Sequence, residues 1–198
     1  MTKREKVDLS RRILDTAAEL FYREGVRSVG VDRIAAESGV AKMTLYYHFR
    51  SKDELVAAWL RRRDDEWMSW LAGAVGRRRG SRLLVVFEAL REWFETPTFR
   101  GCAFVNAYAE LGRSNPAAAE IVASHKRKLA EYLAYLAREE GAAESDADAL
   151  ARELLLLVDG AIVTASIQGD ARAAEDARGA AAKVIAGYSL PPEASATP

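Results

Sequence analysis

Residues 31–55 read VDRIAAESGVAKMTLYYHFRSKDEL, and this stretch decides the fold of the chain. Its first part has the apolar spacing of a one-faced helix, at Val31, Ile34 and Ala35. Gly39 follows as a residue that can end a helix in the left-handed conformation. The stretch therefore predicts two short helices joined by a tight turn, with a third helix beginning soon after.

The second short helix, predicted over residues 42–48, has an inward and an outward side. Leu45 and Phe49 lie one helical turn apart and would turn inward against Ile34. The outward side offers a cation, small or flexible contacts, and hydroxyl and imidazole donors. These come from Lys42, Met43, Thr44, Tyr47 and His48, with Tyr46 on the flank. A helix that lies in the major groove of DNA needs this mixture for base edges and phosphate oxygens.

A capping box, Ser-Lys-Asp-Glu, begins the next helix. Ser51 and Glu54 would satisfy the free amides of its first turn. Lys52 lies in that turn, where its charge and the helix-end amides could share one phosphate. These features extend the predicted DNA-binding surface beyond the second short helix.

Upstream of this motif, residues 8–24 keep helical apolar spacing and end at Gly25. This helix would cover the back of the motif and complete a three-helix head. A basic lead-in precedes it, either as a frayed terminus or as an arm that reaches DNA; it consists of Lys3, Arg4 and Lys6.

The rest of the chain predicts helices only, so we expect an all-α protein of about nine helices. The expected segments cover residues 52–75, 81–96, 100–111, 116–140, 146–168 and 170–188. We expect a DNA-binding domain at residues 1–52, a larger helical effector and dimerisation domain at residues 53–188, and a disordered tail at residues 189–198.

Composition limits the function classes. The 198 residues include 49% apolar residues but no uninterrupted apolar run of about 18, and the N-terminus lacks the apolar region of a signal peptide. We therefore expect a cytoplasmic protein. Cys102 is the only cysteine, which excludes an internal disulfide framework and a cysteine zinc cluster.

Charge is unevenly distributed although the net charge is zero. Residues 1–63 hold 14 Lys and Arg against 9 Asp and Glu, whereas the remainder holds 15 against 20. A basic head on an acidic body suits a protein that binds a polyanion with one part only.

With these residues in place, the chain resembles the TetR family of bacterial transcriptional regulators over nearly its whole length. The joined string carries the resemblance: Ile34-Ala35, Gly39-Val40, Thr44-Leu45-Tyr46-Tyr47-His48-Phe49 and Ser51-Lys52-Asp53-Glu54-Leu55. The resemblance implies that Lys42, Met43 and Thr44 meet bases. It implies mostly phosphate contacts for Tyr46, Tyr47, His48 and Lys52, with Arg33 as a peripheral candidate. Gly30 and Ala41 depart from the commoner pattern, where hydroxyl residues are usual.

The same resemblance implies that the middle helices enclose an effector pocket. The candidate lining residues are Trp67, Trp70, Phe87, Phe104, Asn106, Tyr108, Glu110 and His125, and Phe94 is a further aromatic candidate. Each aromatic could instead be a simple core residue, because aromatic stripes at helical spacing usually just pack. His125 could likewise be a satisfied, half-buried histidine rather than a ligand contact or pH sensor.

The apolar pattern of the two C-terminal helices indicates a dimer interface. The apolar set of residues 150–165 is too wide for a single buried face, which implies a second partner surface. Pairing two such helices with their symmetry mates would make a four-helix interface. The expected interface residues are Leu154, Val158, Ile162, Ala165, Ala181, Val184 and Ile185.

The prediction is a homodimeric repressor that leaves a palindromic DNA operator when a small, largely apolar effector binds. An activator of the same family, or a helical small-molecule-binding protein or enzyme without DNA binding, is the alternative. We expect no cofactor and no metal site, and we expect no catalysis because no catalytic arrangement can be assembled from the sequence.

Overall fold

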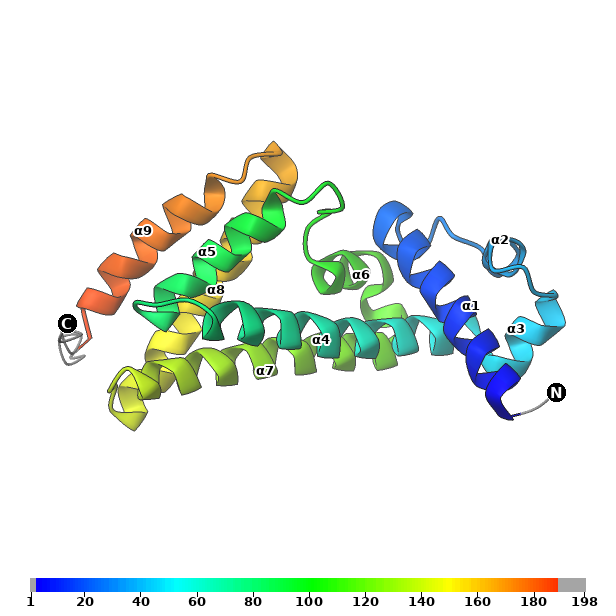
Figure 1. Ribbon diagram of the computed structural model, residues 1–198, viewed down its shortest axis with the longest axis horizontal. Coiled ribbons are helices and arrows are strands. Elements are labelled where there is room, and N and C mark those ends of the chain that lie inside the picture. The colour runs from blue at the N-terminus through cyan, green and yellow to red at the C-terminus, as the bar shows by residue number, and fades with distance from the viewer. Residues whose placement is uncertain (1–2, 189–198) are drawn as a thin grey trace. The chain divides into compact units, whose positions relative to one another are not determined.

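The computed structural model describes residues 3–188, except for the side chains of Lys3, Arg4 and Arg113. Over this range the chain forms nine α-helices and one short 3-10 helix, with no strand (Figure 1). The all-α fold class predicted from the sequence is confirmed. None of the described helices combines the length and the apolar character needed to cross a lipid bilayer. The predicted tail, residues 189–198, lies outside the described residues.

The helices follow the order expected from the sequence. They are α1 Lys3–Glu24, α2 Val31–Glu37, α3 Lys42–His48, α4 Lys52–Gly76, α5 Arg82–Phe94, α6 Ala103–Leu111, η1 Gly112–Ser114, α7 Pro116–Glu139, α8 Glu144–Gln168 and α9 Ala173–Ala186.

The chain divides into two compact units, each made of two stretches of sequence. Unit 1 comprises Met1–Asp65 and Ala103–His125, and unit 2 comprises Glu66–Cys102 and Lys126–Pro198. Helices α4 and α7 each contribute residues to both units. The predicted domain boundary after residue 52 coincides with the first residue of α4, whereas unit 1 extends further and includes α6.

Unit 1 contains the three-helix head, in which α1, α2 and α3 pack against one another. Ile13, Ala17, Ile34 and Leu45 are fully buried there, which is the single small core that the apolar spacing predicts. Helix α1 begins at Lys3 rather than at residue 8. The described part of the basic lead-in is therefore helical, which neither a frayed terminus nor a disordered arm would be.

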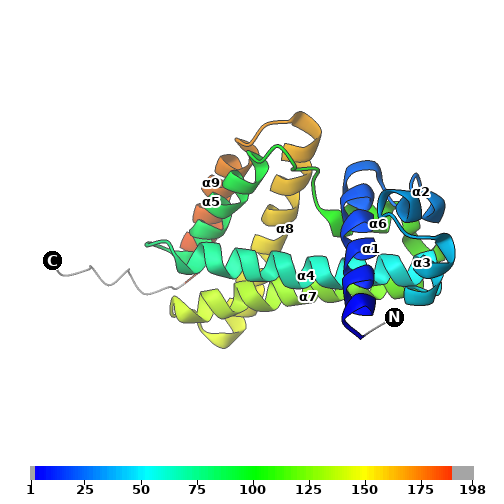
Figure 2. The ribbon, with the colours of Figure 1, turned by 45° about the vertical axis from the view of Figure 1, so that its right-hand side comes forward.

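Unit 2 contains α5, α8 and α9, which lie side by side in both views (Figures 1 and 2). The hydroxyl of Ser81 accepts a hydrogen bond from the backbone N–H of Leu84, so Ser81 caps α5 as expected. Gly169 ends α8 with φ +66°, in the left-handed conformation that glycine adopts without strain. Buried small residues on α9, including Ala174 and Ala181, let neighbouring helices approach closely.

Candidate nucleic-acid interface

The turn between α2 and α3 has the geometry that the sequence predicts. Gly39 has φ +63°, and the N–H of Val40 donates to the carbonyl of Ala35 at 3.0 Å. Behind the turn, the side chains of Ile34 and Leu45 have 0% of their surface exposed. The back of α3 is therefore fixed by buried apolar contacts, and its other side is left outward.

The outward side of α3 carries the predicted base contacts. Met43 is 78% exposed and Tyr47 is 63% exposed, while the side chain of Lys42 is 50% exposed. Thr44 and Tyr46 are half-buried. A short helix supported from behind and exposed in this way can enter a DNA groove.

Two of these exposed side chains already have partners within the chain. Lys42 Nζ lies 2.7 Å from Oδ1 of Asp32 on α2, and this ion pair raises the pKa of Lys42. Lys6 Nζ on α1 donates to the hydroxyl of Tyr47 at 2.7 Å and lies 5.2 Å from the centre of its ring. The sequence analysis placed Lys6 in the basic lead-in without a contact to α3, and it predicted no role for Asp32. Neither partner could be inferred from local spacing, because each belongs to another helix.

Arg33 is occupied by carboxylates. Its Nε donates to Glu37 at 2.7 Å, and its two other nitrogens bind the carboxylate of Glu24. Hydrogen bonds from Arg33 and then from Arg23 lower the pKa of Glu24 to about 2. Arg33 thus ties α2 to the end of α1, and the structure does not present its guanidinium as a free DNA contact.

His48 is less accessible than the outward residues of α3. It is half-buried, and its Nε2 is enclosed without a hydrogen-bond partner, so that nitrogen does not lie on the surface. The ring of Tyr47 covers it edge-on, with 5.2 Å between ring centroids. The predicted phosphate contact from this residue is therefore limited to the other edge of the imidazole.

The first turn of α4 presents Lys52 beside a satisfied helix start. The hydroxyl of Ser51 accepts from the N–H of Glu54 at 3.1 Å, and the Glu54 carboxylate accepts from the N–H of Arg50 at 2.8 Å. The predicted capping box is present, with Glu54 bound to the amide one residue earlier than expected. Lys52 is half-buried, and burial lowers its pKa against an opposing attraction to Glu110.

Glu110 on α6 contacts the head within unit 1. Its Oε2 accepts from the backbone N–H of Arg27 at 2.7 Å, in the loop that follows α1. A Cβ added at Gly25, which has φ +88°, would lie 2.8 Å from Oε1 of the same carboxylate. The predicted effector-orienting residue therefore contacts the loop between α1 and α2.

Aromatic side chains cluster in unit 2. The rings of Trp67, Trp70 and Trp93 lie 5.9 to 6.0 Å apart, centre to centre. Phe99 lies 5.0 Å from Trp93 and 4.8 Å from Phe94. Such spacings are those of directly packed aromatic rings. Of the predicted ligand residues, Trp67 is buried in this cluster and Trp70 packs against it. Trp70, Trp93 and Phe99 keep part of their surface exposed.

Of the other predicted ligand residues, Phe87 lies in unit 2 and five lie in unit 1. His125 is buried, its Nδ1 is 2.8 Å from Oδ1 of buried Asp64, and its ring stacks on Phe104 at 3.7 Å. The satisfied-histidine alternative describes this arrangement. Tyr108 is 51% exposed and Asn106 is exposed.

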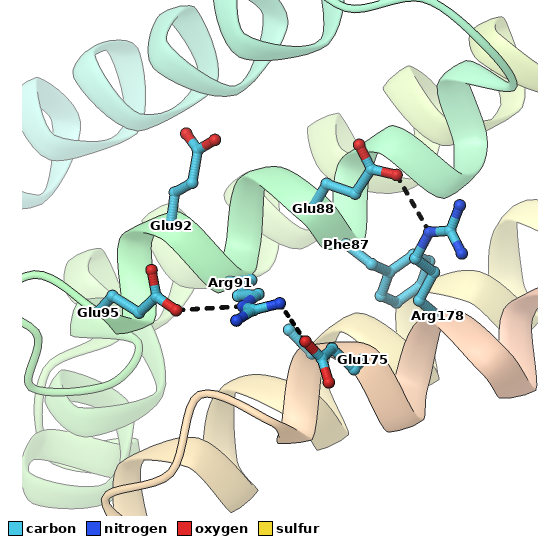
Figure 3. A pocket seen from close by; sticks show the side chains of 8 residues that line it. Phe87, Glu88, Arg91, Glu92, Glu95, Glu175 and Arg178 are labelled. Atoms are coloured by element: carbon cyan, nitrogen blue, oxygen red, sulfur yellow. Dashed lines mark hydrogen bonds and ion pairs between the residues drawn. The ribbon is translucent and has the colours of Figure 1, made fainter.

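An open groove of about 570 Å³ lies between α5 and α9 (Figure 3). Phe87 is the predicted ligand residue that lines it, and most of its other lining side chains are charged. Arg91 binds both Glu95 and Glu175, and Arg178 donates to Glu88 at 3.2 Å (Figure 3). The pairs Arg91–Glu175 and Arg178–Glu88 connect α5 to α9. The polarity of the groove does not suit the apolar effector predicted from the sequence.

Helix α8 has two apolar sides, and the residues predicted for the interface lie on the side that is buried within the chain. Leu154, Val158, Ile162 and Ala165 have at most 2% of their surface exposed, and Ala181 of α9 has 0%. These five side chains are covered by other parts of the same chain, so the structure places them in its core. Val184 and Ile185 are half-buried.

The exposed apolar row on α8 lies on the opposite side of the helix. Leu156 is 73% exposed, Val163 41% and Ile167 78%. Their spacing of seven and four residues places them on one side. This row is the apolar side of α8 that the chain's own packing leaves exposed.

Among the described residues, no three His, Cys, Asp or Glu side chains gather into a group that could hold a metal ion. Cys102 is a buried free cysteine.

Comparisons with known proteins agree with this arrangement. The family model "Bacterial regulatory proteins, tetR family" matches residues 13–59, which contain the head. The model "Tetracyclin repressor-like, C-terminal domain" matches residues 80–181, which is more than half of the chain. The chain belongs to the TetR family. The resemblance stated from the helix-turn-helix string is confirmed.

Individual TetR-family relatives show how far the similarity extends. A TetR-family transcriptional regulator from Streptomyces coelicolor is 33% identical with a TM-score of 0.80, over 91% of this chain and 90% of that one. A TetR transcriptional regulator from Chloroflexus aurantiacus is 25% identical with a TM-score of 0.80, over 95% and 100% of the two chains. The transcriptional activator FasR from Mycolicibacterium smegmatis is 36% identical over 86 residues, which is 42% of this chain and 39% of FasR. The names of all three relatives describe transcriptional regulators.

Proposed function

We propose that this TetR-family protein is a repressor that binds a palindromic DNA operator as a homodimer. The observation that carries the proposal is the outward side of α3, where Lys42, Met43 and Tyr47 are exposed above a buried apolar back. Base edges would meet Lys42, Met43 and Thr44, and phosphates would meet Tyr46, Tyr47 and Lys52. The protein would act in the cytoplasm, where the DNA is.

The exposed apolar row on α8 supports the homodimer. Leu156, Val163 and Ile167 lie on one side of a helix and have no apolar cover in the single chain. Large exposed apolar side chains in a row mark association surfaces. A two-fold axis that passes beside this row would pair α8 with its copy. Val184 and Ile185 of α9 would then lie at the margin of the dimer interface.

Two copies related by a two-fold axis would place their α3 helices in successive major grooves. Half-sites then lie about 34 Å apart, which is one turn of B-DNA. The operator should therefore be a palindrome whose half-sites are centred about 10 to 10.5 base pairs apart, or a multiple of that distance.

A small, largely apolar effector would act through the helical body. The partly exposed aromatic rings of Trp70, Trp93 and Phe99 support an apolar effector. The Arg27 amide donates a hydrogen bond to the Glu110 carboxylate. This contact supports the proposal that α6 transmits the effect of effector binding to the head. The effector can shift the DNA-binding equilibrium only by its differential affinity for the two states.

A selection experiment tests the proposal directly. The purified protein is incubated with a pool of random-sequence duplexes, bound DNA is amplified through several rounds, and the products are sequenced. The proposal requires an enriched palindrome with the stated half-site spacing. A mobility-shift assay with DNA flanking the coding region then locates the natural site. Failure to enrich any sequence would refute specific DNA binding.

Activation instead of repression is the second candidate, and the match to the activator FasR is the observation that favours it. Both outcomes use the same DNA-binding surface, so they differ in the position of the site relative to the promoter. A reporter gene with the selected site, measured with and without the protein, separates them by the sign of the change.

A further inference from the structure

The ion pair between Asp32 and Lys42 joins α2 to the first residue of α3. Lys42 Nζ lies 2.7 Å from Asp32 Oδ1. The Asp32 side chain is 75% exposed and the Lys42 side chain is 50% exposed. An exposed pair of this kind contributes little to stability, so its place beside the predicted base contacts calls for another role.

An ammonium group carries three donors on a flexible stem. An unpaired Lys42 could therefore swing to any nearby phosphate, which adds affinity without sequence information. With one donor directed at Asp32, the ammonium is held at the start of α3 and keeps two donors. Those donors can reach acceptors on a base edge, such as O6 and N7 of guanine.

Other cations of the head are held in different ways. Lys6 is bound to the neutral hydroxyl of Tyr47, so it adds a positive charge near α3. Arg33 is bound by two carboxylates that belong to α1 and α2. Lys42 is the predicted base-contacting cation, and its partner is an exposed acid on the neighbouring helix.

We propose that Asp32 is a positioning residue for DNA recognition: it retains Lys42 at the base edges, prevents that lysine from binding phosphates at random, and so raises discrimination against non-operator DNA. The pair persists in the operator complex, where Lys42 donates to Asp32 and to a base acceptor together. On DNA without that acceptor, Lys42 stays with Asp32 and contributes no phosphate contact. This inference rests on the proposed DNA-binding function.

The test compares two duplexes of equal length over a series of salt concentrations. One is the duplex that the wild-type protein enriches from a random pool, and the other is a scrambled duplex of the same composition. In Asp32→Ala, affinity for the scrambled duplex should rise about tenfold at low salt, and its salt dependence should steepen by about 0.9 per head, the value of one added phosphate contact. Affinity for the enriched duplex should change by less than about threefold, so the specificity ratio falls.

Three variants distinguish this role from a general effect of charge or folding. Asp15→Ala removes the same charge from α1, where Asp15 pairs with Arg11 and Arg62, and it should leave the salt dependence nearly unchanged. Asp32→Glu keeps the carboxylate and should retain the discrimination of the wild-type protein. In a Lys42→Ala background, Asp32→Ala should no longer strengthen binding to the scrambled duplex. Thermal melting of each variant shows that the fold is retained.

The outcomes separate this inference from the function on which it rests. If the wild-type protein enriches no sequence, the proposed function fails, and the positioning role fails with it. If it enriches a sequence but Asp32→Ala leaves the scrambled-duplex affinity unchanged, only the positioning role fails. That role alone also fails if Asp15→Ala has an equal effect, or if the effect of Asp32→Ala persists without Lys42.

Discussion

The carboxylate of Glu110 accepts a hydrogen bond from the backbone N–H of Arg27 at 2.7 Å, across 83 positions of sequence. Glu110 belongs to α6, and Arg27 belongs to the loop between α1 and α2. The same carboxylate attracts Lys52 at the start of α4. One acidic side chain therefore contacts or influences two segments that bracket the helix-turn-helix motif.

Glu110→Ala should destabilise unit 1 by about 1 kcal/mol, because the Arg27 amide loses a charged acceptor. Urea unfolding of the full chain measures the change. Glu110→Gln retains a carbonyl oxygen for the same amide and should recover most of the loss. A Glu110→Ala protein with wild-type unfolding would show that the bond contributes nothing.

Lys52→Ala should weaken binding to every duplex and lower the salt dependence by about one unit, because this residue is expected to contact a phosphate. Lys42→Ala and Thr44→Ala should instead relax sequence preference, with a loss of about 1 to 3 kcal/mol on the preferred duplex. Binding titrations on preferred and scrambled DNA measure both effects. Equal losses on the two duplexes for all three variants would contradict the assignment.

Ile167→Lys should convert the protein from dimer to monomer at micromolar concentration, because it places a charge in the exposed apolar row of α8. Sedimentation velocity measures the oligomeric state. The matched control is Glu131→Lys, at an exposed position on α7, which should remain dimeric. A monomeric wild type, or a dimeric Ile167→Lys protein, would exclude this surface as the interface.

Because of the Glu24 carboxyl, the stability of the head should decrease as the pH falls through the acidic range. Its pKa is about 2 in the folded chain, against an ordinary value of 4.5. The unfolded chain therefore takes up the proton first as pH falls, so the stabilisation is complete above pH 4.5 and is lost between 4.5 and about 2.

Glu24→Gln should accordingly be less stable than the wild type near neutral pH, and the difference should shrink as pH falls through that window. Urea midpoints of both proteins across the acidic range measure the change. A difference that is constant with pH would contradict the role of the Arg33 and Arg23 contacts.

Local sequence signals predicted the helices well. Pro116 begins α7, as its fixed backbone angle and missing N–H favour. Ser81 caps α5, and Gly39 makes the turn before α3. Each of these signals acts within a few residues, so a single sequence is sufficient to reveal it.

Features that depend on distant packing were missed. The spacing on α8 identifies two apolar sides but does not show which one α5 and α9 cover, so the burial of Leu154 and Val158 within the chain was not predicted. Asp32 and Lys6 contact α3 from other helices, and no periodic pattern marks them. The α8 start also differs, at Glu144 rather than residue 146 or 148, because Ala143 provides no side-chain cap to signal it.

Unit 1 is made of two separate stretches of sequence, and these stretches set the cut points for any chimera between this protein and another regulator. Grafting residues 1–52 alone would leave behind α6 and with it the acceptor for the Arg27 amide. A transplant that carries both Met1–Asp65 and Ala103–His125 keeps those partners together. Chimeras with an exchanged head should therefore be assembled from two sequence segments rather than one.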